Sequence, residues 1–501
     1  MKNSLNRYYP EGFKGYKGAN DYKNYERTLI AEKTKSDKVE MLDAIEEIFM
    51  RGLIQDGMCL SFHHHLRNGD FVLNKVCELI LKYDIKNLTL APSSIFPSNK
   101  IVKDLFPNNH VTKIYTDYIS GDVAKAISNG ELNGMVIMQT HGGRPRAIES
   151  GELKIDVAFI AAPTVDKQGN ATGALGKSAC GALGYAVADA MYAKTVCLVT
   201  DNIVEALDDY QIEAEYVDYI IKVDAIGDAK GIVSGTTKIT KDPVGLKIAR
   251  NTANLLYELG AIKTGFSMQT GAGGTSLAVA KYVKDIMVKN NIRAYFASGG
   301  ITEYFVDMLK EGYIDNLFDV QCFDLAAVNS YRENHKHIGI SGSSYANPYD
   351  ENVVDLLTFA ILGATEIDLA FNVNVTTSSH GDIIGGSGGH ADVAHGANIT
   401  VIVTNLIKSR LPIVKEKVTT ITTPGEDVDV LVTERGIAIN PKRKDLLEKV
   451  KDSKLNIVTI EELLETAHKI TGVPAQKEQS NQVVGVVEYR DGTIIDSIYK
   501  I

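Results

Sequence analysis

A glycine-rich loop at residues 385–389 is the part of the chain whose composition most directly suggests chemistry. It reads Gly-Gly-Ser-Gly-Gly and is followed by His390. Glycines packed this densely let the backbone adopt positive φ and let another molecule approach main-chain N–H groups closely. Such groups can bind a phosphate or stabilise a developing oxyanion. A tight turn is the simpler alternative, but the neighbouring Asn372, Asn374 and Ser387 favour a binding or catalytic site.

A second glycine-rich turn, Gly271-Ala272-Gly273-Gly274, precedes a segment with the apolar spacing of a helix. Helix N-termini bind anions through free N–H groups and the macrodipole. The alternative is an ordinary helix start capped by Thr275 or Ser276. The sequence leaves both interpretations open.

Residues 386–391 formally match the dinucleotide-binding pattern G-x-G-x-x-G/A. That pattern needs an acidic residue about twenty positions further on to hold a ribose. Here the corresponding residues 406–412 contain no Asp or Glu, and the chain also lacks the P-loop pattern G-x-x-x-x-G-K-[ST]. We therefore disfavour a nicotinamide dehydrogenase and a P-loop nucleotidase, and we interpret the loop as an acyl or oxyanion site.

Two carboxylates stand where strands are expected to end. Glu303 follows Ser-Gly-Gly-Ile-Thr, and Glu434 follows Val-Leu-Val-Thr. In parallel sheets that edge faces ligands, and a carboxylate there could attack a thioester and carry the acyl group. The alternative for Glu303 is a helix-start residue that interacts with the helix dipole. Glu434 has the same alternative, and Arg435 would then be its ion-pair partner.

Two clusters of basic residues suggest anion or metal binding. Arg144 and Arg146, in His-Gly-Gly-Arg-Pro-Arg, could bind a polycarboxylate by paired hydrogen bonds, or could be solvated arginines in a turn. The run His63-His64-His65 invites a metal interpretation. Only the first and third of these would share a strand face, and no third ligand has supporting spacing, so a structural or substrate-contact role is favoured.

Composition narrows the functional classes. The chain has 501 residues and a net charge of -10, from 63 acidic and 53 basic residues, which argues against nucleic-acid and anionic-membrane partners. Its five cysteines have no paired spacing, which indicates reduced thiols in a cytoplasmic protein. There is no apolar run typical of a signal peptide or a membrane span.

The elements that must position these residues follow an α/β plan. Residues 1–36 show no clear period and are expected to form an arm. Short apolar runs then alternate with helical stretches through residues 37–235, and the alternation begins again in residues 236–501 after a Gly-, Thr- and Lys-rich linker. Such alternation predicts two domains, each a mainly parallel sheet flanked by helices. Residues 483–498 are predicted to end the chain as a hairpin.

Together these segments resemble the CoA-transferase superfamily, and most closely its branch of citrate lyase alpha subunits. Residues 157–173 resemble the Pro…Asp…Gly-Asn signature of the superfamily's first half, and the loop at 385–389 resembles the Gly-Ser-Gly-Gly loop of its second half. The stretches that carry the closer resemblance are 61–70, 298–302, 345–348, 371–375, 386–390 and 433–438.

The resemblance implies two CoA-transferase-like domains and a citrate CoA-transferase reaction, in which acetyl-[acyl-carrier] and citrate give citryl-[acyl-carrier] and acetate. It also implies partners: an acyl-carrier gamma subunit with a phosphoribosyl-dephospho-CoA arm, for which acyl-CoA can substitute, and a lyase beta subunit that cleaves the citryl thioester to oxaloacetate. A homo-oligomer within a hetero-oligomeric complex is expected. No cofactor is expected to be covalently bound to this chain, and no metal is expected.

The residues and the resemblance together give a set of expected site residues. Those expected to be catalytic are Glu303, Gly388 and Gly389. Those expected to bind the thioester are Gly271, Ala272, Gly273, Gly274, Asn372, Asn374, Gly386, Ser387 and His390. Those expected to bind citrate are Arg67, Arg144 and Arg146.

Glu303 takes the alignment position of the acyl-carrying glutamate of acetate-using CoA-transferases. Ile301 and Tyr304 stand where those enzymes have His and Met, and the citrate lyase branch is thought to use a ternary complex without an enzyme thioester. We therefore expect Glu303 to be an acyl carrier or an orienting base. The main-chain N–H groups of residues 385–389 are expected to stabilise the oxyanion.

Two other functions remain open from the sequence. A stand-alone acyl-CoA:carboxylate CoA-transferase or acyl-CoA hydrolase would share the glycine loops but need no partner subunits. A non-catalytic scaffold subunit would use the glycine turns only structurally.

Overall fold

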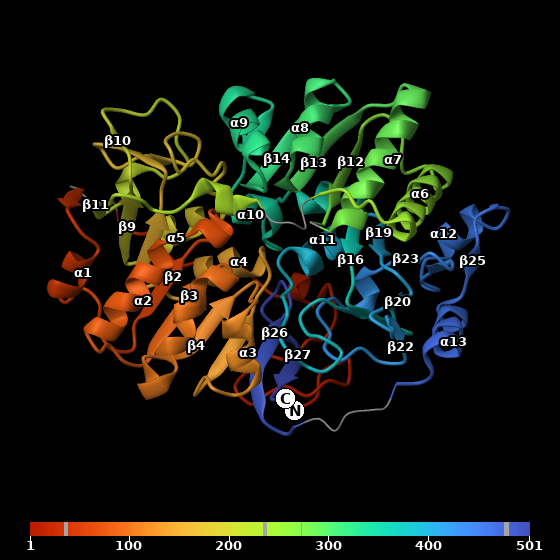
Figure 1. Cartoon of the computed structure of the whole chain (residues 1–501), viewed down its shortest axis with the longest axis horizontal. Helices are drawn as coiled ribbons and strands as arrows, with labels where there is room; N and C mark the ends of the chain where they lie inside the picture. The colour runs from red at the N-terminus through yellow and green to blue at the C-terminus, as the bar shows by residue number, and fades with distance from the viewer. Residues whose placement is uncertain (35–38, 234–237, 272, 475–479) are drawn as a thin grey trace.

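Two large sheets lie side by side in the computed structural model (Figure 1). The structure describes residues 1–34, 39–233, 238–271, 273–474 and 480–501. The predicted domain boundaries, 36/37 and 235/236, lie outside these residues. Both large sheets are mainly parallel and flanked by helices, which confirms the predicted fold class.

The first sheet has ten strands, in the order β1-β11-β9-β6-β2-β3-β4-β5-β26-β27. Every neighbouring pair is parallel except the final β26–β27 pair. In chain order these strands are β1 (Glu40–Leu42), β2 (Cys59–Phe62), β3 (Leu88–Pro92), β4 (Val111–Thr116), β5 (Met135–Met138), β6 (Val157–Ala161), β9 (Thr195–Thr200), β11 (Tyr219–Lys222), β26 (Val483–Glu488) and β27 (Ile494–Tyr499). The helices of this half are α1 (Glu46–Met50), α2 (Val72–Lys82), α3 (Asp122–Ser128), α4 (Gly143–Glu149) and α5 (Val187–Tyr192).

The second sheet has nine strands, in the order β15-β14-β13-β12-β16-β19-β23-β24-β25. Only β23 and β24 are antiparallel neighbours. In chain order they are β12 (Phe266–Thr270), β13 (Ala294–Ile301), β14 (Ile314–Cys322), β15 (His337–Gly339), β16 (Phe359–Gly363), β19 (Thr400–Val403), β23 (Val430–Val432), β24 (Ile437–Ile439) and β25 (Ile457–Val458). The helices are α6 (Pro243–Glu258), α7 (Gly274–Asn290), α8 (Glu303–Lys310), α9 (Leu325–Glu333), α10 (Gly342–Ala346), α11 (His390–Gly396), α12 (Lys444–Lys449) and α13 (Ile460–Thr471).

Three small sheets complete the architecture. Their strands are β7 (Thr164–Asp166), β8 (Ala171–Thr172) and β10 (Ile203–Val204); β17 (Glu366–Asp368), β18 (Val373–Asn374) and β22 (Val414–Lys415); and β20 (Ile407–Lys408) with β21 (Leu411–Pro412). β2 and β6 of the first sheet and β12 of the second are buried at every position, as expected for parallel strands covered on both faces. No helix in the described ranges is both long and apolar enough to span a membrane.

The two halves repeat one plan at the level of individual turns. Seven strands of each large sheet follow the same order, β11-β9-β6-β2-β3-β4-β5 and β23-β19-β16-β12-β13-β14-β15. The Asp166 carboxylate accepts hydrogen bonds from the main chain and side-chain amide of Asn170, both at 2.9 Å. Asp368 does the same with Asn372, at 3.0 and 3.2 Å. The equivalence confirms the expected two copies of one α/β plan.

The C-terminal hairpin crosses from the second half of the sequence to the first sheet. β26 pairs in parallel with β5, and the β26–β27 pair forms the edge of that sheet. The predicted hairpin therefore exists, but residues 236–501 do not all lie with the second sheet. Residue Lys14 accepts a hydrogen bond from the Ile494 N–H, and both chain ends lie close together (Figure 1).

Glu488, at the end of β26, carries a carboxyl group that is buried at this junction. Its Oε2 accepts a hydrogen bond from the Gln139 side chain at 3.0 Å. Burial raises the pKa of Glu488 to about 7, although Arg146 and Gln139 favour its charged form. A buried carboxyl whose pKa is raised is more easily kept protonated than ionised.

We expect the pH dependence of stability to reveal this group. The folded pKa lies above the ordinary value of 4.5, so the contribution of Glu488 to stability is complete below pH 4.5 and is lost as pH rises from there through about 7. Glu488→Gln should remove that loss, worth up to about 3 kcal/mol at pH 8. Urea unfolding at pH 4.5 and 8 measures the difference.

Glu205→Gln is the matched control, because the Glu205 side chain is 81% exposed. If wild type and Glu488→Gln respond alike to pH, the buried carboxyl of Glu488 does not titrate as described.

Candidate active site between the two halves

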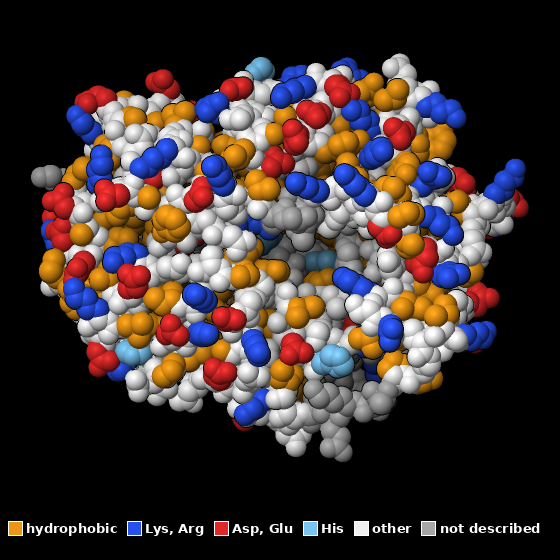
Figure 2. Space-filling model, in the orientation of Figure 1, with side chains coloured by type: hydrophobic (Ala, Val, Ile, Leu, Met, Phe, Trp, Pro, Cys, Tyr) orange, Lys and Arg blue, Asp and Glu red, His pale blue; other side chains and the backbone are white. Residues whose placement is uncertain are grey.

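The carboxyl ends of the strands of the two large sheets meet along one seam. In the first half, His64 follows β2, Asp117 follows β4 and His141 follows β5. The loop at 385–389 of the second half docks there: the Gly388 N–H donates to the Asp117 carbonyl at 3.0 Å, and the His141 N–H donates to the Gly388 carbonyl at 2.9 Å. In return, Gln321 at the end of β14 donates to the His64 carbonyl at 2.8 Å. Figure 2 shows a hollow in the middle of this face, with a histidine side chain inside it.

His141 and Asp117 form a pair beside the glycine loop. His141 Nδ1 lies 2.8 Å from Asp117 Oδ2, and the Asp117 carboxylate is fully buried. Burial raises the pKa of Asp117, while the hydrogen bond to His141 opposes that rise. Gly388 has a φ of +50°, and a Cβ there would stand 3.3 Å from His141 Nε2. The loop therefore needs glycine at 388 both for its backbone conformation and to let this histidine approach.

Aromatic and histidine rings cluster around His141. Tyr185 lies in a short 3-10 turn, Gly184–Ala186, directly before α5. The centre of its ring is 4.6 Å from that of His141 and 4.8 Å from that of His64. His64 Nδ1 lies 2.6 Å from Ser93 Oγ, and burial holds the pKa of His64 well below its usual range. From the second half, the Gln269 side chain donates to the Tyr345 hydroxyl at 2.7 Å.

Many buried polar atoms near the seam lack a hydrogen-bond partner. In the described part of the chain these include His65 Nε2, Arg67 Nε and Nη1, Asp117 Oδ1, Gln269 Oε1, Thr270 Oγ1, Ser298 Oγ and Thr302 Oγ1. Buried polar groups are normally hydrogen-bonded, so a concentration of unsatisfied ones marks a place where a polar ligand would complete the structure.

Arg67 is the expected citrate-binding arginine that the structure places at the seam. Its guanidinium lies 5.4 Å from the centre of the Phe96 ring and 4.7 Å from that of Phe323, so aromatic rings of both halves contact it. Burial lowers the pKa of Arg67. Its φ of +51° is unusual for a residue with a side chain, and such strain is concentrated at functional sites.

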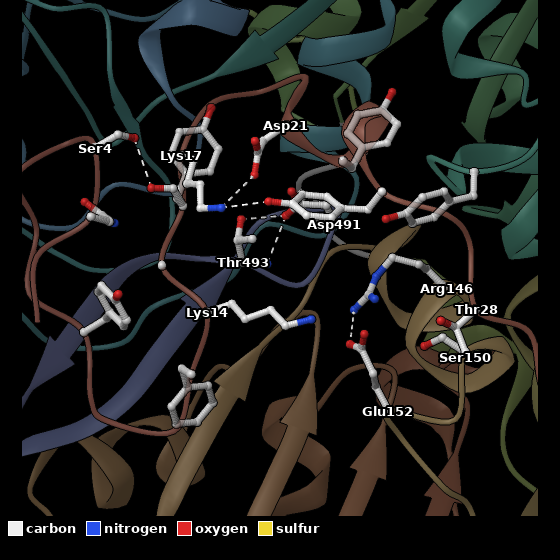
Figure 3. Close-up of a pocket in the computed structure, with 18 of the residues that line it drawn as sticks. Ser4, Lys14, Lys17, Asp21, Thr28, Arg146, Ser150, Glu152, Asp491 and Thr493 are labelled. Carbon is white, nitrogen blue, oxygen red and sulfur yellow. Dashed lines mark hydrogen bonds and ion pairs between the residues drawn. The ribbon is translucent and has the colours of Figure 1, made fainter.

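The other two expected arginines do not join Arg67. Arg144 is buried against the first half, where its Nη2 lies 2.7 Å from Asp189, which in turn lies 3.1 Å from His63. Arg146 lies 2.9 Å from Glu152 and lines a different cavity, beneath the N-terminal arm (Figure 3). The sequence predicted that both bind a polycarboxylate, with two solvated arginines in a turn as the alternative. The alternative is wrong, because both side chains are buried and each is paired with a carboxylate of this chain. The structure separates them because α4 turns its positions 144 and 146 to different surroundings.

Several expected thioester-binding side chains are already occupied by structural hydrogen bonds. His390 Nδ1 lies 2.7 Å from Thr423 Oγ1, and its Nε2 lies 2.9 Å from the Gly363 carbonyl. Asn372 bonds to Asp368 and accepts from the Gly425 N–H. The buried Asn374 bonds to Glu366 and to the residue 376–377 backbone. These three side chains shape the loop rather than project free groups from it.

The glycine loop itself offers fewer N–H groups than its composition suggests. Gly388 already donates to Asp117, so its N–H is not available to an oxyanion. No acceptor is found within the described ranges for the N–H groups of Gly386, Ser387 and Gly389. These three remain the candidates for the expected role.

Glu303 and the Gly271–Gly274 turn lie at the strand ends of the second half. Glu303 begins α8, is exposed, and its N–H donates to the Asp324 carboxylate at 2.7 Å. The turn at 271–274 links β12 to α7, as predicted, and α7 has Gly273 at its N-cap with no side-chain cap. The alternative of a cap by Thr275 or Ser276 is therefore wrong. Ala272 lies outside the described residues.

Three side chains of types that can bind a metal lie close together in the described part of the second half. Ligand atoms of the buried Asp319, Cys322 and His337 all lie within 4.8 Å of one another. Asp319 Oδ2 accepts from the Cys322 thiol at 2.9 Å and lies 3.0 Å from His337 Nε2. These bonds satisfy the three groups mutually. Asp319 lies within β14 and His337 begins β15, so this pair is not at the carboxyl ends of its strands, unlike Asp117 and His141.

Sequence reasoning missed His141, Asp117 and Tyr185. His141 stands in the same short segment as Arg144 and Arg146, but only the two arginines were predicted to bind a ligand. Its spacing from Asp117, 24 residues along the chain, carries no local signal. No local pattern in the sequence marks the pair, because it depends on which strands are neighbours in the sheet.

Comparison with known proteins agrees with this geometry. Residues 38–501 match the family model described as citrate lyase, alpha subunit. The chain is 45% identical over 482 residues to the citrate lyase alpha chain of Haemophilus influenzae, covering 96% of each chain. It is 41% identical over 502 residues to that of Klebsiella pneumoniae, covering 99% of this chain and 98% of the relative.

Solved structures give the same result. A citrate lyase alpha subunit from Streptococcus mutans, solved in complex with citrate, matches with a TM-score of 0.94 and 42% identity, covering all of both chains. A malonate decarboxylase hetero-tetramer from Pseudomonas matches with a TM-score of 0.63 and 13% identity, covering 87% of this chain and 84% of that one, which shows a shared fold. The full-length matches show that this chain belongs to the citrate lyase alpha subunit family, and they confirm the expected citrate CoA-transferase rather than a stand-alone enzyme or a scaffold.

Proposed function

We propose that the hollow between the two halves is where this chain exchanges an acyl thioester from acetate to citrate. The observation that carries the proposal is the convergence of Arg67, the His141–Asp117 pair and the Gly386–Gly389 loop on one seam lined with unsatisfied polar atoms. Each contributes a function that acyl exchange between two carboxylates needs: charge for citrate, an oriented imidazole, and N–H donors for an oxyanion.

Citrate is proposed to bind through Arg67. A guanidinium presents a fork of N–H donors that matches a carboxylate bidentately, and two of the three nitrogens of Arg67 have no partner among the described residues. The flanking rings of Phe96 and Phe323 exclude water from its faces. Unpartnered hydroxyls at Ser298 and Thr302 could complete the contacts with the other carboxylates.

The thioester carbonyl is proposed to face the glycine loop. A citrate carboxylate oxygen attacks the acetyl carbonyl carbon, a new C–O bond forms, and the C–S bond breaks to release the thiolate and a mixed anhydride. The thiolate then attacks the citryl carbonyl, and the anhydride C–O bond breaks to release acetate. No net proton is consumed, and each addition places negative charge on a carbonyl oxygen that N–H groups of Gly386, Ser387 or Gly389 can stabilise.

His141 is proposed to orient citrate. If Nδ1 donates to Asp117, the imidazole is held in one tautomer and Nε2 faces the loop as an acceptor for the citrate hydroxyl. Asp117 thereby acts on His141 as a buried orienting carboxylate. Tyr185, packed against the same ring, restricts the orientation further.

The partners and cofactor follow the same assignment. We propose that the thioester arrives on the phosphoribosyl-dephospho-CoA arm of a gamma subunit, with acyl-CoA as a substitute, and that a beta subunit cleaves the citryl product. The uncapped start of α7 after the Gly271–Gly274 turn is the proposed contact for phosphates of that arm. Within the described residues all five cysteines are free thiols, which supports a reducing, cytoplasmic location.

Glu303→Gln tests the role of the exposed carboxylate at the start of α8. We expect purified wild-type protein to convert acetyl-CoA and citrate to citryl-CoA and acetate, and the variant to lose this exchange by about 10²-fold or more. Mass spectrometry of the wild type distinguishes the two roles. Direct attack by citrate predicts no enzyme thioester, and loss of activity without one identifies Glu303 as an orienting base. An enzyme thioester would instead identify an acyl carrier and would contradict direct attack by citrate. Near-normal exchange in the variant would exclude both.

His141→Gln tests the imidazole. The variant retains a polar side chain but cannot present Nε2 in the same place, so we expect kcat/KM for citrate to fall by about 10²-fold. His335→Gln is the matched control, because His335 is an exposed histidine outside the seam. Equal activities of the two variants would remove His141 from the proposed site.

A further inference from the structure

A second cavity, separate from the interdomain hollow, lies between the N-terminal arm and the body of the first half. Its volume is about 830 Å³. The arm forms one wall, and the opposite side is formed by α4 and the turn between β26 and β27 (Figure 3). Cavities of 300–1,000 Å³ are typical of metabolite sites, so its size is sufficient for a bound small molecule.

Two cationic groups point into this cavity. The Arg146 side chain is 4% exposed, and its guanidinium projects inward from α4 (Figure 3). One nitrogen donates to Glu152, but the buried Nε has no partner. The Lys14 ammonium projects from the arm and has no ion-pair or hydrogen-bond partner in the described part of the chain. An incompletely paired guanidinium beside a free ammonium is suited to bind a phosphate.

Aromatic rings make up much of the remaining wall. The rings that line the cavity are Tyr9, Phe13, Tyr16, Tyr22, Tyr25 and Tyr349. Tyr22 and Tyr349 pack edge to face, with ring centroids 5.6 Å apart. Flat rings of this kind stack on a nucleobase, at about 1–3 kcal/mol per base.

A carboxylate acceptor lies between the cations and the rings. Asp491 Oδ1 accepts from the Thr493 N–H and hydroxyl, at 2.9 and 2.6 Å. Asp491 Oδ2 accepts no hydrogen bond from the described residues. Acidic side chains placed in this way bind ribose hydroxyls in nucleotide sites.

We propose that this cavity is a binding site for a nucleoside monophosphate, with its phosphate on Arg146 and Lys14, its ribose on Asp491 and its base against the tyrosine wall. A phosphate alone would leave the rings unused, and a nucleoside alone would leave Lys14 unpaired and Arg146 paired only with Glu152. The other basic groups that line the cavity already have partners. Lys17 is 3.8 Å from Asp21, and Arg27 is bonded to Glu149 and Asp350. Lys2 donates to the Asn6 side chain, and the N-terminal ammonium donates to the Tyr9 carbonyl. The ligand's charge is therefore met by Arg146 and Lys14.

The same elements extend to the interdomain seam. Arg490 precedes Asp491 in the turn and lies 3.6 Å from the buried Asp392. Asp392 in turn accepts hydrogen bonds from the Thr140 hydroxyl and the Gly142 N–H, both at 2.9 Å, on either side of His141. A ligand that fixes α4 and this turn would act on the residues that hold His141, so the site is placed to serve as an effector site.

Isothermal titration of the full-length protein with AMP tests the proposal, with adenosine and inorganic phosphate as separate arms. AMP should bind, and each fragment should bind at least ten-fold more weakly. Lys14→Ala should weaken AMP at least ten-fold, as should Arg146→Gln. Lys310→Ala, which removes an exposed lysine of α8, should leave it within two-fold. Because Lys14 is exposed, its variant tests the site even if the Arg146 variant does not fold.

A repeat titration in saturating S-acetylpantetheine, a thioester that lacks the nucleotide of CoA, separates this cavity from the thioester site. AMP should still bind the thioester-loaded protein with full stoichiometry, because the two sites are distinct. Absence of AMP binding, equal affinity in Lys14→Ala, or competitive displacement of AMP by the thioester would each overturn the proposal.

Discussion

The docking of the second half's glycine loop onto the strand ends of the first half is the contact on which the candidate site depends. The two hydrogen bonds that Gly388 makes, one with Asp117 and one with His141, fix the loop against two strands of the opposite sheet. A side chain at 388 would be strained by the positive φ and would crowd His141. The close approach of backbone to imidazole therefore sets both the place of the loop and the residue type that it can contain.

A network of buried charged side chains also stabilises that contact. Asp392, fully buried in α11, accepts hydrogen bonds from Thr140 and Gly142 of the first half. Arg490, also fully buried, approaches it from the C-terminal hairpin. Removing one partner of a buried charged pair typically costs about 3–5 kcal/mol because the other charge stays desolvated. By joining the first sheet, the hairpin places the positive charge of Arg490 next to Asp392 in the helix that follows the glycine loop.

Local patterns in the sequence were enough to predict the α/β class, the duplicated plan, the glycine loop and the helix after the Gly271–Gly274 turn. Each of these has a signal within about twenty residues, such as apolar alternation or clustered glycine. The pairing of β26 with β5 joins segments about 350 residues apart, and no local pattern specifies it. The Asp117–His141 pair depends on which strands are neighbours. Arg144 and Arg146 look equivalent in the sequence, and only the orientation of α4 separates them. Asn372, Asn374 and His390 are residue types suited to ligand binding. Their polar groups are already used in hydrogen bonds to neighbouring residues of this chain.

The central claim is that citrate binds at the seam between the halves, and a crystal structure of this protein with citrate tests it most directly. The account predicts citrate with a carboxylate within hydrogen-bonding distance of Arg67 and its hydroxyl facing His141 Nε2, beside the Gly386–Gly389 loop. Citrate bound in the cavity beneath the N-terminal arm, against Arg146, with the seam free of ligand, would contradict it.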